Sequence, residues 1–276
     1  MEVPQVKFIE RLEAAAVKND SLVCVGLDSD AAKLPAGVDQ LAFNRAIIDA
    51  THDLAAAYKP NTAFYEARGA EGIQALKDTC DYIRSKAPDA LILLDAKRAD
   101  IGNTNEGYIR FAYDYLGADA ITLHPYLGGE ALAPFLSRAD KGAIVLCRTS
   151  NPGAGEFQDQ YIDGHKLFEH VAKMVASDWN ASGNCMLVVG ATYPEEALAV
   201  RKMVGDDVWF LMPGIGAQGG SVEQIMTAAQ NSRGTGLLIN SSRGIIFASS
   251  GRDFAAAARA KAETLRDEIN TYRKAT

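Results

Sequence analysis

An aspartate, a lysine and a second aspartate stand within six residues at the end of an apolar run, and together they suit proton transfer. The run 91–94 leads directly into Asp95, which is followed by Lys97 and Asp100. An unbroken apolar run is typical of a strand buried on both faces. Side chains alternate along a strand, so Asp95 and Lys97 should point the same way, and Asp100 should lie where the chain turns near Gly102. Charges at the carboxyl end of a buried parallel strand stand where α/β barrels keep their chemistry.

Lys59 ends another short apolar run, and we expect it to join these charges. The resulting array has formal charges that sum to zero: Lys59, Asp95, Lys97 and Asp100. The balance matters because an unpaired buried charge costs several kcal/mol. A salt-bridge network on a solvated loop is the alternative, and the apolar run before Asp95 argues against it. The flanking carboxylates favour the ammonium form of Lys97, which predicts a proton donor rather than the Schiff-base nucleophile of a class I aldolase.

Two glycine-rich loops late in the chain predict a phosphate site. The loop 213–220 contains Gln218, and the loop 240–244 contains Arg243. Glycines let backbone N–H groups approach an anion closely, and in barrels the phosphate typically lies after the seventh and eighth strands. Arg243 offers a planar fork of donors and Gln218 a neutral donor. Glycines that only make tight turns are the alternative, and two such loops at the two expected strands outweigh it.

Short apolar runs alternate along the chain with longer amphipathic segments of helical spacing. The expected strands cover residues 21–27, 57–61, 90–96, 118–123, 142–147, 185–190, 208–212 and 236–240. This alternation, without any linker-like stretch, predicts an α/β protein built as a single (β/α)8 TIM barrel, one domain over residues 1–276. A doubly wound open sheet is the main alternative. It usually carries G-x-G-x-x-G after the first strand, where this chain reads G-L-D at 26–28.

Composition and charge argue against several classes of function. The chain has 28 Lys and Arg against 35 Asp and Glu, a net charge of −7, and no basic block, so no nucleic-acid partner is expected. The cysteines Cys24, Cys80, Cys147 and Cys185 lack the spacing of a metal site, which predicts no metal and a reducing, cytoplasmic location. The sequence holds no apolar signal core and no window long enough to span a membrane, so no membrane association is expected.

The stretch 95–104, DAKRADIGNT, resembles the D-x-K-x-x-D-I-x-x-T signature of the orotidine 5′-phosphate decarboxylase family. Further matching motifs occur in the family's order at 26–28, 59–61, 149–153, 213–220 and 242–244. The DAKRADIGNT core and the Ser-Asn-Pro-Gly loop look like the longer bacterial branch. D-x-K-x-x-D alone is shared with related sugar-phosphate barrels, whereas its combination with Ser150, Gln218 and Arg243 is more specific.

The resemblance implies a barrel homodimer that converts orotidine 5′-phosphate to UMP and CO₂ with no metal or organic cofactor. By position, Lys97 would deliver a proton to C6, and Asp95 would lie beside the substrate carboxylate. Lys59 would hold the charge array and reach the ribose. Loss of CO₂ leaves a carbanion without an attached electron sink, which a preorganised cation stabilises and then protonates.

The substrate-binding residues implied by the resemblance are Asp28, Ile101, Thr104, Ser150, Pro213, Gln218, Ser242 and Arg243. Asp28 would bind ribose hydroxyls and Ser150 the pyrimidine. Gln218, Arg243 and nearby backbone amides would hold the phosphate.

The resemblance also implies active sites shared between two subunits. Asp100, Ile101 and Thr104 would reach the active site of the partner. Ser242 departs from shorter family members, where glycine is common at this position. A backbone contact there would tolerate the change.

Two rival functions stay open at this point. A sugar-phosphate decarboxylase of the same barrel group would use the acids to hold Mg²⁺ and form an enediolate, leaving Ser150 without a pyrimidine to contact. A non-catalytic nucleotide-binding protein would bind UMP without turnover, but the balanced charge array argues against a pure binder. His124, after the fourth strand, is open to a structural or a functional role. The loops 150–157 and 216–220 are candidates for closing over a ligand.

Overall fold

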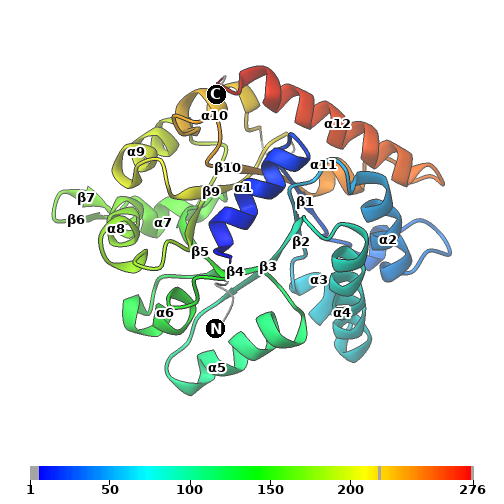
Figure 1. Cartoon of the computed structure of the whole chain (residues 1–276), viewed down its shortest axis with the longest axis horizontal. Coiled ribbons are helices and arrows are strands. Elements are labelled where there is room, and N and C mark those ends of the chain that lie inside the picture. Colours follow the sequence, from blue (N-terminus) through cyan, green and yellow to red (C-terminus); the bar gives the residue numbers. More distant parts are fainter. Residues whose placement is uncertain (1–5, 217–218, 275–276) are drawn as a thin grey trace.

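A closed barrel of parallel strands forms the centre of the computed structural model, which describes residues 6–216 and 219–274 (Figure 1). Within this described part, the neighbours around the barrel are β1, β10, β9, β8, β5, β4, β3 and β2, returning to β1. The barrel strands are β1 (Val23–Gly26), β2 (Ala57–Lys59), β3 (Leu91–Arg98), β4 (Ala120–Leu123), β5 (Gly142–Arg148), β8 (Cys185–Val189), β9 (Trp209–Pro213) and β10 (Leu237–Ser241). The predicted eight-stranded parallel barrel is confirmed, and the open sheet is wrong.

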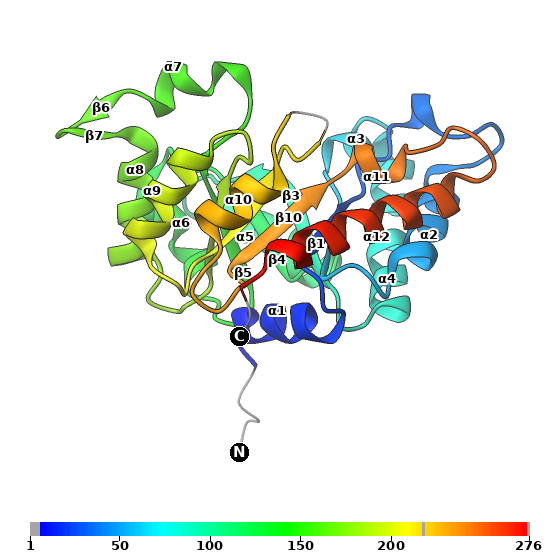
Figure 2. The ribbon, with the colours of Figure 1, turned by 90° about the horizontal axis from the view of Figure 1, so that it is seen from above.

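Helices surround the barrel between successive strands (Figure 1). The α-helices of the described chain are α1 (Phe8–Lys18), α2 (Gln40–Thr51), α3 (Ala63–Glu66), α4 (Gly69–Lys86), α5 (Asn103–Ile109), α6 (Gly128–Leu136), α7 (Gly155–Gln158), α8 (Leu167–Met174), α9 (Pro194–Val204), α10 (Val222–Ala229), α11 (Arg243–Ile246) and α12 (Phe254–Tyr272). Short 3₁₀ turns form η1 (Ala31–Lys33) and η3 (Pro152–Ala154), and π-helical turns η2 (Arg110–Tyr115) and η4 (Val175–Trp179) continue α5 and α8. A small antiparallel hairpin, β6 (Tyr161–Ile162) and β7 (His165–Lys166), projects outside the barrel (Figure 2).

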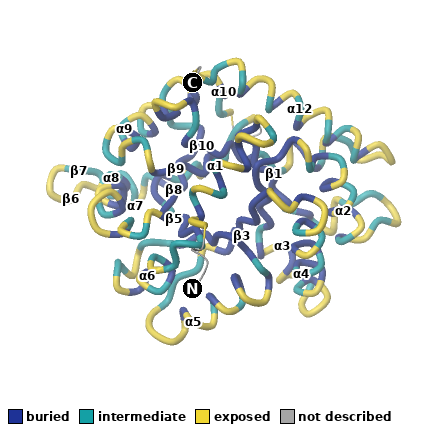
Figure 3. Tube along the Cα trace, in the orientation of Figure 1, coloured by how far each residue is buried: buried dark blue, intermediate teal, exposed yellow. Residues whose placement is uncertain are grey.

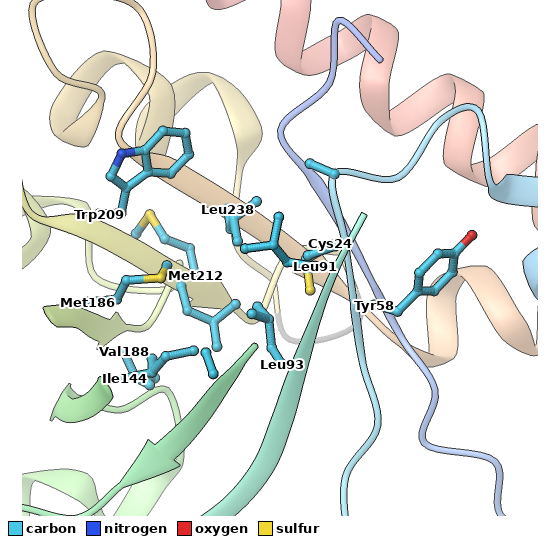
Figure 4. Close-up of a cluster of buried hydrophobic side chains, with 14 of the residues drawn as sticks. Cys24, Tyr58, Leu91, Leu93, Ile144, Met186, Val188, Trp209, Met212 and Leu238 are labelled. Carbon is cyan, nitrogen blue, oxygen red and sulfur yellow. The ribbon is translucent and has the colours of Figure 1, made fainter. Parts of the chain in front are cut away.

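The strands form because their side chains are apolar on both faces, one packing inside the barrel and the other under the helices. Figure 3 shows the strands as the buried part of the chain, with exposed residues on the outer helices and loops. Figure 4 shows Leu93, Val188 and Trp209 within one cluster of buried side chains drawn from several strands. Strand β2 is shorter than expected and ends at Lys59, since Pro60 has no N–H to donate to a neighbour.

Helix α1 lies at the amino end of the barrel, opposite the loops that carry α3, α7 and α11 (Figure 2). The Phe8 N–H donates to the Ala139 carbonyl at 2.9 Å, just before β5. The Phe8 ring packs so closely on Gly142 that a Cβ there would lie 2.5 Å from it. The open end of the barrel is therefore the carboxyl end of the strands, where a site is expected. Within residues 6–216 and 219–274, every helix is too short or too polar to cross a bilayer.

Candidate active site

Three of the four predicted charges meet at the carboxyl end of the barrel. Asp95, in β3, is 8% exposed and accepts a hydrogen bond from each of two lysines. Lys59 Nζ lies 2.8 Å from its Oδ2, and Lys97 Nζ lies 2.6 Å from its Oδ1. Lys59 is buried, whereas the side chain of Lys97 is half-exposed and can meet a ligand.

Asp100 does not complete this cluster within its own chain. Its carboxylate accepts the Ile101 N–H at 2.7 Å, and no ion pair joins it to a lysine among the described residues. The fourth charge is Asp28 at the end of β1, 3.7 Å from Lys59 Nζ. Within one chain the charge cluster is therefore Asp28, Lys59, Asp95 and Lys97, which is neutral in sum, and the expected place of Asp100 in the array stays a prediction that involves the partner subunit.

A bulge in β3 directs Asp95 and Lys97 to the same place. Leu94 pairs with Ile121 of β4, but the next pair along is Arg98 with Leu123, so 95–97 face Thr122 alone. Lys97 has a φ of 48°, in the left-handed region that non-glycine residues avoid. Regular alternation was thus the wrong reason for the predicted proximity, because the extra residues break the regular pairing. Strained backbone of this kind is common at active sites.

Neighbouring opposite charges keep both Asp95 and Lys59 charged despite their burial. Burial by itself would raise the pKa of the Asp95 carboxyl, but the charges of Lys59 and Lys97 outweigh it and hold that pKa well below its usual range. Burial likewise opposes the charge of Lys59, and the neighbouring Asp95 and Asp28 carboxylates raise the pKa of Lys59 above its ordinary value. The site thus holds fixed charges beside a low-dielectric interior.

Two neutral side chains complete the hydrogen bonding of Asp95. Asn61 Nδ2 donates to Oδ2 at 3.2 Å, and Thr122 Oγ1 donates to Oδ1 at 3.0 Å. Asn61 belongs to a motif visible in the sequence. Thr122 was missed, and the signal that it offered was a buried hydroxyl in an otherwise apolar strand end, Ala120–Leu123.

Two adjoining cavities open beside the charge cluster, and both include Lys59, Asp95 and Pro213 in their walls. One, of about 170 Å³, extends toward the β10 loop with Asp28, Asn240, Ser242 and Arg243. The other, of about 420 Å³, extends over the barrel with Lys97, Thr122, Ser150, Gln158 and an apolar wall of Leu146, Val188 and Leu211. Arg243 and Ser150, predicted to bind the phosphate and the ring, thus line two cavities that share one charged centre.

Asp28 and Arg243 share the smaller cavity with the glycine-containing loop after β9. Asp28 Oδ1 is buried without a hydrogen-bond partner among the described residues, so it can accept from a ligand hydroxyl. Arg243 begins helix α11 at the end of β10. Gln218, the predicted donor of the preceding loop, lies outside the described residues.

Ser242 is accommodated by a glycine on the neighbouring strand. A Cβ on Gly26 would collide with Ser242 Oγ. Strand β1 therefore needs glycine at this point to let the β10 loop approach. The absence of a side chain on Gly26 leaves room for the Ser242 side chain.

Ile101 and Thr104 lie apart from these cavities. Ile101 is 59% exposed on the turn after β3, and Thr104 is exposed in the first turn of α5. Within the described chain they line neither cavity. An exposed apolar residue beside a predicted site residue is what a subunit contact would use.

The loop after β5, which carries Ser150, is held by Arg148 and Gln158, and sequence reasoning assigned neither. Gln158 Oε1 accepts the Thr149 N–H at 2.9 Å, and its Nε2 donates to Thr149 Oγ1 at 2.8 Å. Arg148 is buried, with its guanidinium 4.0 Å from the Tyr193 ring centre. It also lies 3.5 Å from Asp159, which fixes the base of the projecting hairpin.

His124 has a structural contact. Its Nε2 lies 3.0 Å from the Ala99 carbonyl oxygen, and its backbone N–H donates to the Arg98 carbonyl at 3.0 Å. Both bonds hold the chain that leaves β3.

Comparison with known proteins gives one consistent match. Residues 21–260 match the family model described as orotidine 5′-phosphate decarboxylase / HUMPS family. A protein named orotidine 5′-phosphate decarboxylase from Azoarcus sp. (strain BH72) is 49% identical over 271 residues, covering 96% of this chain and 99% of the relative. The protein of the same name from Cellvibrio japonicus is 47% identical over 97% of this chain and 100% of its own length. The solved structure of Leishmania donovani OMP decarboxylase aligns with a TM-score of 0.85 at 39% identity, covering 98% of this chain and 100% of that one.

Proposed function

The chain belongs to the orotidine 5′-phosphate decarboxylase / HUMPS family and is a decarboxylase of pyrimidine biosynthesis, and we propose that it converts orotidine 5′-phosphate to UMP and CO₂ without a cofactor. The observation that carries the proposal is the Lys97 ammonium, 2.6 Å from Asp95 at the edge of the larger cavity. That geometry offers a fixed cation and a proton at one point.

Lys97 acts on the electron pair that departing CO₂ leaves on C6. When the bond from C6 to the carboxylate breaks, its electrons stay on C6, and the ammonium stabilises the growing negative charge. A Lys97 N–H proton then forms the new C6–H bond, leaving a neutral amine that solvent reprotonates. Side-chain exposure of 50% gives Lys97 the access to solvent that this last step needs.

Asp95 and the apolar wall favour loss of the substrate's own charge. A carboxylate placed beside ionised Asp95 meets repulsion, which is relieved when it leaves as neutral CO₂. Leu146 and Val188 in the larger cavity offer no hydrogen bond to a carboxylate but can accept an uncharged molecule.

Asp28 and Arg243 bind the parts of the substrate that do not react. Asp28 Oδ1, which is buried without a hydrogen-bond partner among the described residues, accepts from ribose hydroxyls, and Lys59 lies beside it. Arg243, the backbone of its loop and Gln218 hold the phosphate, as Ser150 and Pro213 hold the ring. Binding energy from the remote phosphate can order the site, so kcat should depend on the phosphate as well as KM.

A magnesium-dependent sugar-phosphate decarboxylase fits this site less well. Both oxygens of Asp95 already accept hydrogen bonds from two lysines, Asn61 and Thr122. A metal ion would have to displace cations from the carboxylate, at a cost in charge repulsion.

The direct test follows the absorbance of orotidine 5′-phosphate in buffer with EDTA. We expect decarboxylation at an undiminished rate in EDTA and release of UMP. Activity that disappears in EDTA and returns with Mg²⁺ would favour the rival reaction, and UMP binding without turnover would favour a pure binding protein.

Lys97→Ala separates catalysis from binding. We expect turnover to fall by about 10⁴-fold or more, since both the cation and the proton donor are removed. Binding of UMP, measured by calorimetry, should stay within about threefold of wild type, because the phosphate and ribose contacts are intact. Full activity in Lys97→Ala would show that another group donates the proton.

We also propose a homodimer with shared active sites, in which Asp100, Ile101 and Thr104 complete the site of the partner. The exposed side chain of Ile101, and an Asp100 carboxylate that forms no ion pair with a lysine of the described chain, support this. Lys97→Ala and Asp100→Ala should each be inactive alone, and mixed dimers should regain activity because one of their two sites is intact. Verified heterodimers without activity would contradict the sharing.

We propose that residues 1–276 act as one domain, which the continuous barrel supports. We propose a cytoplasmic location, supported by cysteines that are all free and buried.

A further inference from the structure

We propose that Thr122 is a positioning residue that orients Asp95 and Lys97 together through one hydroxyl group. The inference rests on the proposed function and deepens it, because it names a group that acts on the proton donor without touching the substrate's reacting atoms. Thr122 stands in β4, 1% exposed, at the edge of the larger cavity.

The β3 bulge creates the need for such a residue. Between the pairs Leu94 with Ile121 and Arg98 with Leu123, three residues of β3 face a single residue of β4. The amides of Ala96 and Lys97 therefore lose regular ladder partners. Buried amides without partners are costly, so something must accept their hydrogen bonds.

The Thr122 hydroxyl accepts both of these amides. The Ala96 N–H lies 3.0 Å from Oγ1 and the Lys97 N–H lies 2.9 Å from it. A threonine hydroxyl has two lone pairs and one hydrogen. Because amides can only donate, both lone pairs are used, and the hydroxyl hydrogen must point elsewhere.

That hydrogen points to Asp95. Oγ1 lies 3.0 Å from Asp95 Oδ1, the same oxygen that accepts from Lys97 Nζ at 2.6 Å. One hydroxyl thus joins the carboxylate and the backbone of Lys97 in a closed set of hydrogen bonds. Its direction is fixed by the two amides rather than chosen by the carboxylate.

The strained backbone of Lys97 makes this link consequential. A φ of 48° is unfavourable for lysine and persists only where surrounding contacts enforce it. The hydrogen bond from the Lys97 N–H to the Thr122 hydroxyl is one such contact. Without it, we expect the residue to relax toward ordinary strand geometry and carry Nζ away from its place beside Asp95.

The test compares Thr122→Val, which keeps the shape but removes the hydroxyl, with Thr122→Ser, which keeps the hydroxyl. We expect kcat for orotidine 5′-phosphate to fall about 10- to 100-fold in Thr122→Val with KM within about threefold, because misplacing the reacting group affects the chemical step more than binding. Thr122→Ser should stay within about threefold of wild type in kcat.

Thr79→Val is the matched control. Thr79 is 0% exposed in helix α4, where its hydroxyl donates to the Ala75 carbonyl at 2.7 Å and accepts from Asn44 at 3.0 Å. It should lower the melting temperature to a similar extent while leaving kcat unchanged. A purely structural role for Thr122 predicts that the two valine variants behave alike.

Amide hydrogen exchange gives a readout that needs no activity. Exchange at Ala96 and Lys97 should accelerate at least about tenfold in Thr122→Val relative to Thr122→Ser, since two amides lose their acceptor. Unchanged exchange at both amides, or unchanged kcat in Thr122→Val, overturns the inference. Wild-type protein that does not decarboxylate orotidine 5′-phosphate overturns the proposed function instead, and the exchange result stands apart from it.

If Thr122→Val does not fold, Thr122→Cys takes its place in the comparison. Thr122→Cys replaces the hydroxyl by a weak donor and acceptor of similar size. Its kcat should fall between those of the serine and wild-type forms on one side and the valine form on the other. Wild-type kcat and exchange in Thr122→Cys would equally overturn the inference.

Discussion

The Asp95 carboxylate is buried yet ionised, because each of its oxygens faces a lysine. The low pKa of Asp95 therefore depends on the neighbouring lysines. Removing one charged group leaves its partner buried without a counter-charge, which costs stability. Lys59 is the member most at risk, since it is 4% exposed and cannot turn to solvent. The same charged groups therefore contribute to stability and to the proposed catalysis.

Replacement of Asp95 by Asn should lower the free energy of unfolding at pH 7 by about 3 kcal/mol, because Lys59 is left buried beside a neutral amide. The folded pKa of Asp95 is lowered, so its contribution is complete above its ordinary pKa and is lost as pH falls below about 4. The pKa of Lys59 is raised, so its contribution is lost only as pH rises above about 10. Measured by urea unfolding, the difference in the free energy of unfolding between wild type and Asp95→Asn should be constant between about pH 5 and 9. It should become smaller in acid.

Asp89→Asn is the control for this measurement. Asp89 pairs with Lys18 at an exposed site, so its loss should change the free energy of unfolding by less than about 1 kcal/mol. A difference for Asp95→Asn that vanishes near pH 6 would contradict the assigned direction of its pKa.

Gly26→Ala should disturb the β10 loop, since the new Cβ collides with Ser242 Oγ. We expect weaker UMP binding, by about tenfold, because the loop also carries Arg243. Adding Ser242→Gly should restore binding, as the two side chains compete for one space. Calorimetric titration of UMP against the single and double variants measures the coupling, and additive effects would show that the contact is unimportant.

At the scale of elements, Arg201 of α9 joins neighbouring units of the barrel through backbone carbonyls. Its guanidinium donates to the carbonyls of Gly205, Val208, Ala229 and Gly236 at 2.7 to 2.9 Å. It also lies 4.0 Å from the Phe210 ring centre. This buried cation donates hydrogen bonds to backbone carbonyls where α9 and α10 end and where β9 and β10 begin.

Arg201→Met should therefore lower the free energy of unfolding by about 3 kcal/mol, because several buried carbonyls lose their donor. Lys202→Met, on the exposed side of the same helix, should change it by less than about 0.5 kcal/mol. Denaturant unfolding of both variants measures the contrast. Equal effects would mean that the helix surface, and not the carbonyl contacts, sets the cost.

The strands were predictable from the sequence because buried strands are apolar runs. The part of the site that was predictable consists of charged residues at the ends of those runs. Apolar runs located every barrel strand, and Lys59, Asp95 and Lys97 came together as expected. The bulge was not predictable, because alternation assumes regular pairing. Thr122 was missed for the same reason, since its partners are backbone amides that only the bulge frees.

Asp100 illustrates a different gap between sequence and structure. The residue pattern placed it in the charge array, the family resemblance placed it in the site of the partner, and within one chain Asp28 stands beside Lys59. Strand spacing says which side chains lie near a strand end, but it does not say which subunit's site they reach.

The whole molecule protects its thiols by the same packing that closes the barrel. Cys24, Cys80, Cys147 and Cys185 are free and buried, and burial raises the pKa of each thiol to about 12. Thiolate is the reactive form, so a buried thiol with a raised pKa reacts slowly. The fold therefore shields every cysteine of the chain at neutral pH.

Native protein at pH 8 should leave its thiols unreacted with a chromogenic disulfide over minutes, and unfolding in guanidinium should release all four. Absorbance at saturating reagent counts the reacted groups. Rapid reaction of one thiol in the native state would identify a strand that opens locally.

Both ends of the described chain lie at the base of the barrel. Helix α1 packs there, and near the other end Arg273 pairs with Asp20 at 2.9 Å, while the Lys274 N–H donates to Gln230 at 2.9 Å. Immobilisation through either end would hold the molecule with the open, carboxyl end of the barrel facing the solvent. Enzyme coupled in this way to a bead or a sensor surface should keep free diffusion of nucleotide to and from the opening.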